Sequence, residues 1–131
     1  MTTKPKRKRA PAARRLPGEI TRTIEAARDK KATDIVVLDL RKTSAFADFF
    51  VICSGQNVRQ VKAVVEAIEE AQRAARVRPA HVEGYDQAGW VLMDFFDFIV
   101  HVFTPETRSF YSLERLWGDA VRIDVPDSPR P

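Results

Sequence analysis

The amino-acid sequence predicts an α/β domain of the α+β type, with a mixed sheet of about five strands and helices mainly on one face. Two observations support this fold class. Short runs of apolar, β-branched and aromatic residues, which are typical of strands, recur at residues 34–40, 48–53, 80–85 and 90–103. Other segments carry apolar side chains at the spacing of an amphipathic helix, so helices and strands are mixed along the chain.

Charge divides the chain into a basic segment and an acidic body. Residues 1–17 carry seven of the 22 Lys and Arg residues and none of the 18 acids, which leaves 15 bases against 18 acids elsewhere. With three prolines and no apolar face to bury, residues 1–17 are predicted to be a disordered basic tail. Two interpretations of this tail stay open, namely nonspecific contact with RNA phosphates and a solubilising role.

The remaining residues are predicted to form one domain at residues 18–120 and a C-terminal tail at residues 121–131, which contains three prolines. A chain of 131 residues is long enough to bury its own core, and a single cysteine excludes an intramolecular disulfide. No apolar run approaches the roughly 20 residues of a membrane helix. We therefore expect a cytoplasmic protein without membrane association.

The first predicted helix spans residues 19–31. Its apolar stripe consists of Ile20, Ile24, Ala27 and Lys31. The runs at residues 34–40 and 48–53 are nearly continuous in apolar character, which predicts strands covered on both faces. Cys53 lies in the second run, where a small buried side chain is favoured over a nucleophile or a metal ligand.

A long helix is predicted from residue 57 to residue 78, with Asn57 as its N-cap and Gln60 completing a capping box. Its packing stripe consists of Val61, Val64, Val65, Ile68, Ala71 and Ala75. A strand, a turn at Ser54-Gly55 and a helix N-terminus also describe a phosphate site. One glycine and no lysine at the turn make nucleotide binding the weaker interpretation.

Residues 90–103 predict two strands joined by a tight connection. In the first strand, Val91 and Met93 point to a plain core face. The opposite face carries Trp90, Leu92 and Asp94. Because such a face is costly to bury and unusual to leave bare, we expect a partner to dock there.

The segment that follows is predicted to be a short helix over residues 106–117, with Phe110, Leu113 and Trp117 at helical spacing. Residues 81–119 hold seven acids and only two bases, which are Arg108 and Arg115. This half of the domain should therefore attract a basic partner.

Catalysis is poorly supported by the sequence. Asp94 and Asp97 invite a metal site, but a spacing of three places them on opposite faces of one strand, and a hairpin edge is the favoured interpretation. His101 is open to two interpretations, a buried neutral imidazole and a contact residue of the docking face. Nucleophile elbows, metal-ligand quartets and dinucleotide fingerprints are absent, so we expect neither an enzyme nor a cofactor.

Residues 30–64 and 82–120, which include the run GWVLMDFFDFIVHVFTPETRSFYSLERLW, resemble the ribosomal silencing factor family, also called RsfS or Iojap-like. The resemblance covers residues 19–120. It implies a fold related to nucleotidyltransferases without their catalytic carboxylates. It also implies binding to protein fourteen of the large ribosomal subunit, which would block joining of the small subunit and lower translation when nutrients are short.

By resemblance, the docking surface consists of Trp90, Leu92, Asp94, Asp97, His101, Phe103, Tyr111, Glu114 and Trp117. Two departures stand out, because the family usually has Gly at the position of Phe96 and Ser or Thr at Asn57-Val58. Phe96 makes a glycine-type hairpin turn harder to form. The rival classes are a residual nucleotidyltransferase-like enzyme and an RNA-binding module, and a homodimer through the same surface is an alternative state of the free protein.

Overall fold

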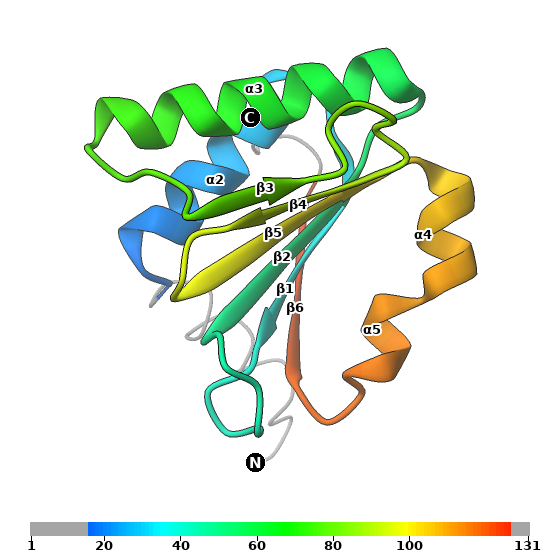
Figure 1. Ribbon diagram of the computed structural model, residues 1–131. Helices are drawn as coiled ribbons and strands as arrows, with labels where there is room; N and C mark the ends of the chain where they lie inside the picture. Colours follow the sequence, from blue (N-terminus) through cyan, green and yellow to red (C-terminus); the bar gives the residue numbers. More distant parts are fainter. Residues whose placement is uncertain (1–15, 127–131) are drawn as a thin grey trace.

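The computed structural model describes residues 16–126, which form one six-stranded mixed sheet with four helices (Figure 1). The strands are β1 (Thr33–Asp39), β2 (Phe49–Ser54), β3 (His81–Glu83), β4 (Trp90–Asp94), β5 (Phe98–Phe103) and β6 (Val121–Val125). The helices are α2 (Gly18–Asp29), α3 (Val58–Ala74), α4 (Pro105–Tyr111) and α5 (Leu113–Leu116). This architecture confirms the predicted fold class, whereas the relationship to nucleotidyltransferases stays a prediction.

The strand order is β3-β4-β5-β2-β1-β6, so β5 and β2 lie at the centre. These two strands are parallel, and every other neighbouring pair is antiparallel. The central pair connects residues far apart in the chain, because Phe50 lies opposite Ile99 and Ile52 lies opposite His101. The pairing with β2 therefore fixes the position of β5, and the pairing of β5 with β4 fixes the side chains of β4 relative to β2.

The two long helices, α2 and α3, lie side by side on one face of the sheet, as predicted (Figure 1). Their stripes pack on the strand residues that point the same way, including Val51, Val91, Met93, Val100 and Val102, all fully buried. Lys31 does not belong to the stripe of α2, because the helix ends at Asp29 and Lys31 is exposed. Among the described residues, no helix has the length and apolar character needed to cross a membrane.

The two short helices, α4 and α5, lie on the other side of the sheet (Figure 1). A single helix over residues 106–117 was expected, but Ser112 adopts a left-handed conformation with φ of 48° and separates two helices. Leu113 is buried against the sheet, whereas Phe110 is 79% exposed. The helical spacing of Phe110 and Leu113 therefore does not place them on one buried face.

The start of α3 confirms the predicted cap. The Asn57 Oδ1 atom accepts a hydrogen bond from the Gln60 backbone N–H at 2.9 Å. The return bond of the capping box shifts by one residue, since Gln60 Oε1 accepts from the N–H of Gln56 at 2.6 Å. The helix ends at Ala74 rather than near residue 78, because Arg76 turns into the left-handed region with φ of 66°.

Two predicted tail boundaries are wrong at their inner ends. Residues 121–125, expected to fray, form the edge strand β6, which pairs with β1 and buries Ile123. At the other end, Leu16 packs against the core and the carbonyl of Pro17 accepts the first backbone hydrogen bonds of α2. Residues 1–15 and 127–131 of the two predicted tails lie outside the described residues.

The turn between β4 and β5 carries Phe96 with φ of 75°, a left-handed conformation that favours glycine. The N–H of Asp97 donates to the carbonyl of Phe95 at 2.9 Å, the hydrogen bond of a γ-turn. Asp94 supports the turn by accepting from the N–H of Phe96 at 2.8 Å. Positive φ in a residue with a Cβ costs about 1–2 kcal/mol. The chain thus forms the expected hairpin with backbone strain at Phe96.

We expect Ile123→Ala to lower the free energy of unfolding by roughly 2–4 kcal/mol, because the side chain is buried where β6 meets the core. Urea unfolding measures the change. Arg122→Ala is the matched control, since Arg122 is exposed on the same strand and its loss should change stability by about 0.5 kcal/mol or less. Equal stabilities of Ile123→Ala and the wild type would show that β6 does not contribute to the fold.

Candidate protein-docking surface

The candidate surface is the face of β4 and β5 that points away from α2 and α3. Alternation along β4 buries Val91 and Met93 completely and leaves Trp90, Leu92 and Asp94 half-buried, as predicted. On β5 the residues opposite these three are Phe103, His101 and Ile99. We call these six residues, together with Phe50 of β2, the aromatic face.

Trp90 is the central side chain of the aromatic face. Its ring stacks on Phe103 with a centroid distance of 5.0 Å and lies 4.7 Å from the ring of Tyr111 on α4. Its Nε1 atom donates a hydrogen bond to Nδ1 of His101 at 3.1 Å. Three neighbours, two on β5 and one on α4, therefore fix the orientation of a tryptophan that keeps part of its surface exposed.

His101 lies beneath Trp90 and is buried, with 3% exposure. Burial lowers the pKa of its imidazole from 6.5 to about 4, so the ring is neutral at pH 7. Because Nδ1 accepts from Trp90, the ring proton belongs on Nε2, which has no hydrogen-bond partner among the described residues. The ring also makes a T-shaped contact with Phe50 at 4.6 Å. His101 thus supports the aromatic face from below, which is the first of its two predicted roles.

The aromatic contacts continue from β4 to the end of α5. Phe50 bridges the two ends, because it contacts His101 on one side and meets Trp117 in a T-shaped contact at 5.8 Å on the other. Trp117 is half-buried and packs on the cluster that contains Phe50 and Leu113. The two tryptophans, distant in sequence, therefore belong to one continuous aromatic cluster.

A partly buried ion pair holds α4 and α5 in place. Arg108 donates to Oε2 of Glu114 from Nη2 at 2.7 Å and from Nε at 3.2 Å. The same guanidinium donates to Ser54 Oγ at 2.9 Å and to the carbonyl of Asp34 at 2.6 Å. Burial raises the pKa of Glu114, but the hydrogen bonds and the charge of Arg108 together lower that pKa by more. The pKa of Glu114 therefore lies below its usual value. Both charges are thus satisfied within the molecule.

The structure sorts the nine residues of the predicted docking surface into contact and support positions. Trp90, Leu92, Asp94, Asp97, Tyr111 and Trp117 are half-buried or exposed. His101 and Phe103 are buried beneath them, and the Glu114 side chain is 18% exposed and paired with Arg108. These last three residues shape the surface and do not present themselves to a partner.

The turn at Ser54-Gly55, for which a phosphate site is the weaker interpretation, has a structural explanation. A Cβ atom on Gly55 would lie 2.9 Å from the backbone nitrogen of Val61, so glycine is required for close approach of the helix. The hydroxyl of Ser54 accepts from Arg108, and side chains of Asn57 and Gln60 already satisfy amides near the helix start. The turn serves packing and capping.

Asp94 and Asp97, for which a hairpin edge is the favoured interpretation over a metal site, both lie at the β4–β5 turn. Asp94 supports the γ-turn by accepting from the N–H of Phe96, and Asp97 closes that turn through its own backbone N–H. Over residues 16–126, three or more His, Cys, Asp or Glu side chains nowhere converge in a geometry suited to a metal ion. Cys53 is buried, which raises its pKa to about 12, so it behaves as a small core residue.

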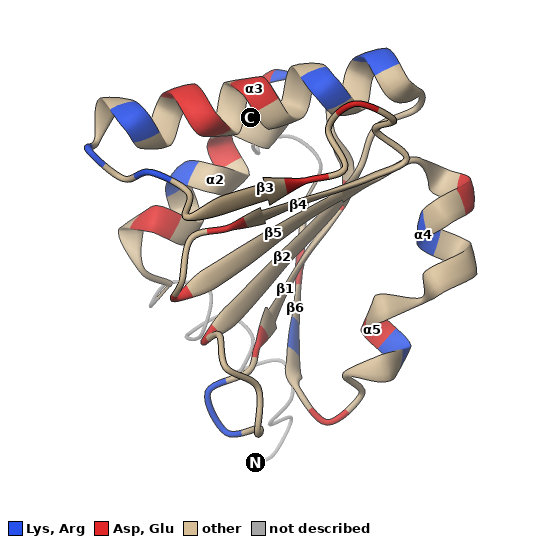
Figure 2. Ribbon diagram, in the orientation of Figure 1, with Lys and Arg blue, Asp and Glu red and all other residues tan. Residues whose placement is uncertain are grey.

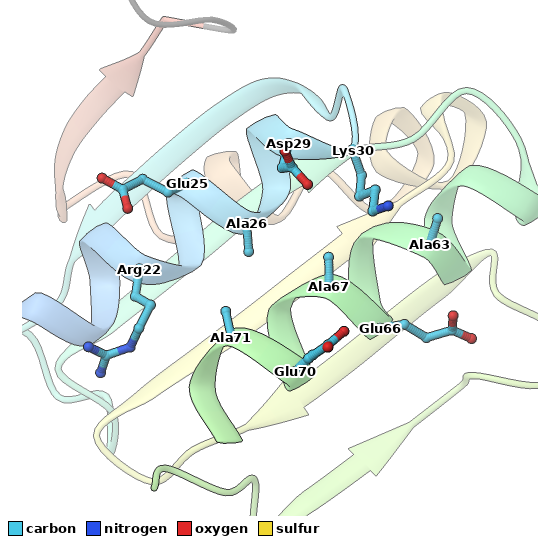
Figure 3. Close-up of a pocket in the computed structure, with 10 residues that line it drawn as sticks. All are labelled: Arg22, Glu25, Ala26, Asp29, Lys30, Ala63, Glu66, Ala67, Glu70 and Ala71. Carbon is cyan, nitrogen blue, oxygen red and sulfur yellow. The ribbon is translucent and has the colours of Figure 1, made fainter. Parts of the chain in front are cut away.

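A groove of about 570 Å³ runs between α2 and α3 on the opposite side of the molecule (Figure 3). Alanines form its floor and charges of both signs form its rim. Figure 3 shows Glu25 and Glu66 directed away from the facing helix, and Arg22 is engaged by Gln72 at 2.9 Å. The groove lacks the converging polar groups that orient a small ligand.

The fold and the aromatic face together define a class, a small α/β domain whose mixed sheet is covered by long helices on one face and only partly covered on the other. Residues 13–131 match the family described as "Ribosomal silencing factor during starvation". The chain belongs to this ribosomal silencing factor family, as the sequence resemblance indicated.

Known relatives agree with this family. The chain is 43% identical over 97 residues to ribosomal silencing factor RsfS of Bacillus subtilis, covering 74% of this chain and 82% of the relative. It is 31% identical over 102 residues to the mouse protein named mitochondrial assembly of ribosomal large subunit protein 1, covering 76% and 45% respectively. A crystal structure of a Chromobacterium violaceum protein matches with a TM-score of 0.73 at 33% identity, covering 86% of this chain and 88% of that one.

Sequence reasoning missed two residues on which the surface depends, Phe50 and Arg108. Phe50 alternates with Ile52 in an apolar run, but only the parallel pairing of β2 with β5 places it beside His101. In the sequence, Arg108 is distinguished only as one of two bases in the acidic residues 81–119. Its four hydrogen bonds join segments up to 74 residues apart, and no local pattern signals such contacts.

The lowered pKa of His101 predicts a pH-dependent stability. Above pH 6.5 the imidazole is neutral in both states; as pH falls toward 4, only the unfolded state takes up the proton, so stability is lost in this window. The loss attributable to His101 amounts to about 3 kcal/mol, because each pKa unit corresponds to about 1.4 kcal/mol. Urea unfolding of the wild type and His101→Gln from pH 7 to pH 4 measures it. Curves that stay parallel over this range would contradict a buried neutral imidazole.

Proposed function

We propose that this protein is a ribosomal silencing factor that binds protein fourteen of the large ribosomal subunit. The bound factor blocks joining of the small subunit by steric hindrance and represses translation under nutrient limitation. Membership of the ribosomal silencing factor family supports a ribosomal target. The name of the mouse relative, which refers to assembly of the large subunit, supports a site on that subunit.

The observation that carries the proposal is the half-exposed, fixed position of Trp90 on the aromatic face. Protein interfaces concentrate binding energy in a few aromatic anchors within a polar rim. Trp90 has Tyr111 beside it, 49% exposed, and Asp94 on the same strand face. Such a combination suits a protein partner better than a small ligand, since no enclosed cavity is needed.

Charge supports a basic partner. Acidic side chains mark the ends of β4, β1 and β3 and the starts of β5 and β2, and the loop between β1 and β2 carries the bases Arg41 and Lys42 (Figure 2). Ribosomal proteins carry excess positive charge because they contact RNA. Attraction of this kind speeds association and favours basic partners over others.

The rival functions have less support. A nucleotidyltransferase-like enzyme would use Ser54, Gly55, Asp94 and Asp97. In this structure Ser54 accepts from Arg108, Gly55 allows close packing of α3, and the two aspartates take part in the hydrogen bonds of the β4–β5 turn. An RNA-binding module would rely on the basic N-terminal segment, against an acidic body that repels phosphates. We therefore propose a cytoplasmic regulator that needs no cofactor, with contact between rRNA and the basic segment, and self-association when free, as accessory features.

The first test is functional. The purified protein should sediment with isolated large subunits and reduce the formation of joined ribosomes from the two subunits, measured on sucrose gradients. Turnover of a nucleotide in the presence of a divalent metal, abolished by Asp94→Asn, would instead establish the enzyme.

Replacing the anchor should weaken binding. We expect Trp90→Ala to reduce affinity for protein fourteen by about 30-fold or more, since aromatic anchors contribute about 2 kcal/mol or more. The change also removes the stack on Phe103 and the hydrogen bond to His101, so some stability is lost. Calorimetric titration is therefore run at a temperature where a thermal melt shows the variant to be folded.

Val91→Ala is the matched control on the same strand. Val91 is fully buried on the opposite face, so its truncation should lower the free energy of unfolding by roughly 1–3 kcal/mol and leave the affinity of the folded protein unchanged. An affinity loss for Val91→Ala equal to that for Trp90→Ala would mean that the aromatic face is not the docking surface.

Deleting residues 1–15 tests the basic segment. Leu16 and Pro17 are retained because they contact the core and α2, so the melting temperature should stay within a few degrees of the wild type. Binding to whole large subunits should weaken and lose part of its salt dependence, because seven bases are removed. Binding to isolated protein fourteen should not change. An unchanged salt slope with whole subunits would remove the rRNA contact from the proposal.

A further inference from the structure

The β4–β5 turn exposes a bulky aromatic residue in a strained conformation. Phe96 has φ of 75°, and its side chain is 73% exposed. It belongs to neither of the two core clusters, so folding gains little packing from the phenyl ring. Backbone strain that is not offset by packing in the core is typical of residues that contact a partner outside the chain.

A second phenylalanine projects from the neighbouring loop between β1 and β2. Phe46 is 106% exposed, which means that it makes almost no contact within the molecule. Its loop is nevertheless held in place, because Ala47 on one side is buried and Ala45 on the other packs against the core. The exposure of Phe46 therefore reflects the direction of its side chain rather than a loose loop.

The two loops are joined to each other. The N–H of Asp48 donates to the carbonyl of Asp97 at 2.7 Å, and the strands that follow these residues, β2 and β5, run parallel with Phe49 opposite Phe98. Both loops thus lie at the same end of the sheet (Figure 1). We call Phe46, Asp48, Phe96 and Asp97 the phenylalanine tip.

Carboxylates outnumber bases around the phenylalanine tip. Asp48 and Asp97 are exposed, and Asp94 borders the turn from the aromatic face. Asp39 ends the next strand and is paired with Arg41 at 2.8 Å, and the adjacent base Lys42 is exposed. Exposed phenyl rings between carboxylates fit an apolar recess bordered by Lys or Arg, because both the contact and the charges are then satisfied.

The tip is also continuous with the aromatic face. Asp94 of the aromatic face connects the two, since its Oδ1 atom accepts a hydrogen bond from the N–H of Phe96 in the tip. A partner seated on Trp90 and Leu92 would reach the end of β4 within a few residues, because a strand advances about 3.3 Å per residue. One partner of ordinary interface size can therefore cover both.

We propose that Phe46 and Phe96 form a second anchor of the docking surface and insert into an apolar recess, bordered by basic side chains, on the same large-subunit protein. This inference rests on the proposed function. It assigns affinity and specificity to the end of the sheet as well as to its aromatic face, through two residues outside the predicted docking surface.

The test uses two effects of opposite sign. Phe96→Gly should raise the midpoint of urea unfolding, because glycine adopts φ of 75° without strain. The same change should weaken binding to protein fourteen about tenfold in calorimetric titration. Phe46→Ser should leave the unfolding midpoint unchanged and also weaken binding about tenfold. A purely structural role for either side chain would move stability and affinity together.

Val58→Ala is the matched control, since Val58 is 42% exposed at the start of α3 and should change neither property. Trp90→Ala is measured beside these variants. Wild-type affinity in both Phe96→Gly and Phe46→Ser, with weaker binding by Trp90→Ala, would overturn the second anchor and leave the proposed function intact.

Two further outcomes also overturn the proposal. Absence of wild-type binding to protein fourteen and to large subunits would remove the proposed function and the second anchor together. Loss of self-association in Phe96→Gly on analytical ultracentrifugation, with unchanged affinity for protein fourteen, would assign the phenylalanine tip to a second copy of the chain.

Discussion

The alternation of β4 is the constraint on which the rest of the aromatic face depends. Val91 and Met93 must lie under the long helices, because both are fully buried in the core. A slip of one residue would expose them and drive Asp94 into that core, so the register with β5 is strongly specified. The position of Trp90 is therefore determined by the residues on the other face of its own strand.

The short helices complete the surface through a different interaction. Helices of seven and four residues are too short to be stable alone, and the left-handed Ser112 between them removes helical continuity. Arg108 compensates by joining α4 to Glu114 at the start of α5 and to the ends of two strands. The place of Tyr111 beside Trp90 thus depends on an ion pair beneath the surface.

Local patterns were sufficient to predict most of the elements and the two faces of β4. They also predicted the cap at Asn57, since capping depends on residues within one turn. They did not reveal β6, although Val121, Ile123 and Val125 alternate as in a strand, because the prolines after them favoured a tail. Such an edge strand can be predicted only when the fold shows that one edge of β1 would otherwise lack a pairing strand.

The site was predicted less completely than the fold, for a physical reason. Alternation along a strand indicates which face is exposed, and therefore which residues belong to a docking surface. Which of those residues contact the partner and which lie beneath them depends on pairing between distant segments. His101 and Phe103 share a strand face with exposed neighbours, yet Trp90 and Phe50 cover them. Glu114 has a charged side chain at a helix end, and only the position of Arg108 turns it inward.

The buried imidazole beneath Trp90 shows how stability and binding are balanced on this face. An unpartnered Nε2 atom in an apolar cluster costs about 1–3 kcal/mol, and an apolar side chain at position 101 would avoid that cost. Such a side chain would also lose the acceptor that fixes the indole ring of Trp90. Immobilising a side chain on binding costs about 0.5–1.5 kcal/mol. An anchor already held in one orientation avoids much of that loss, so a polar group that weakens the core strengthens the proposed interface.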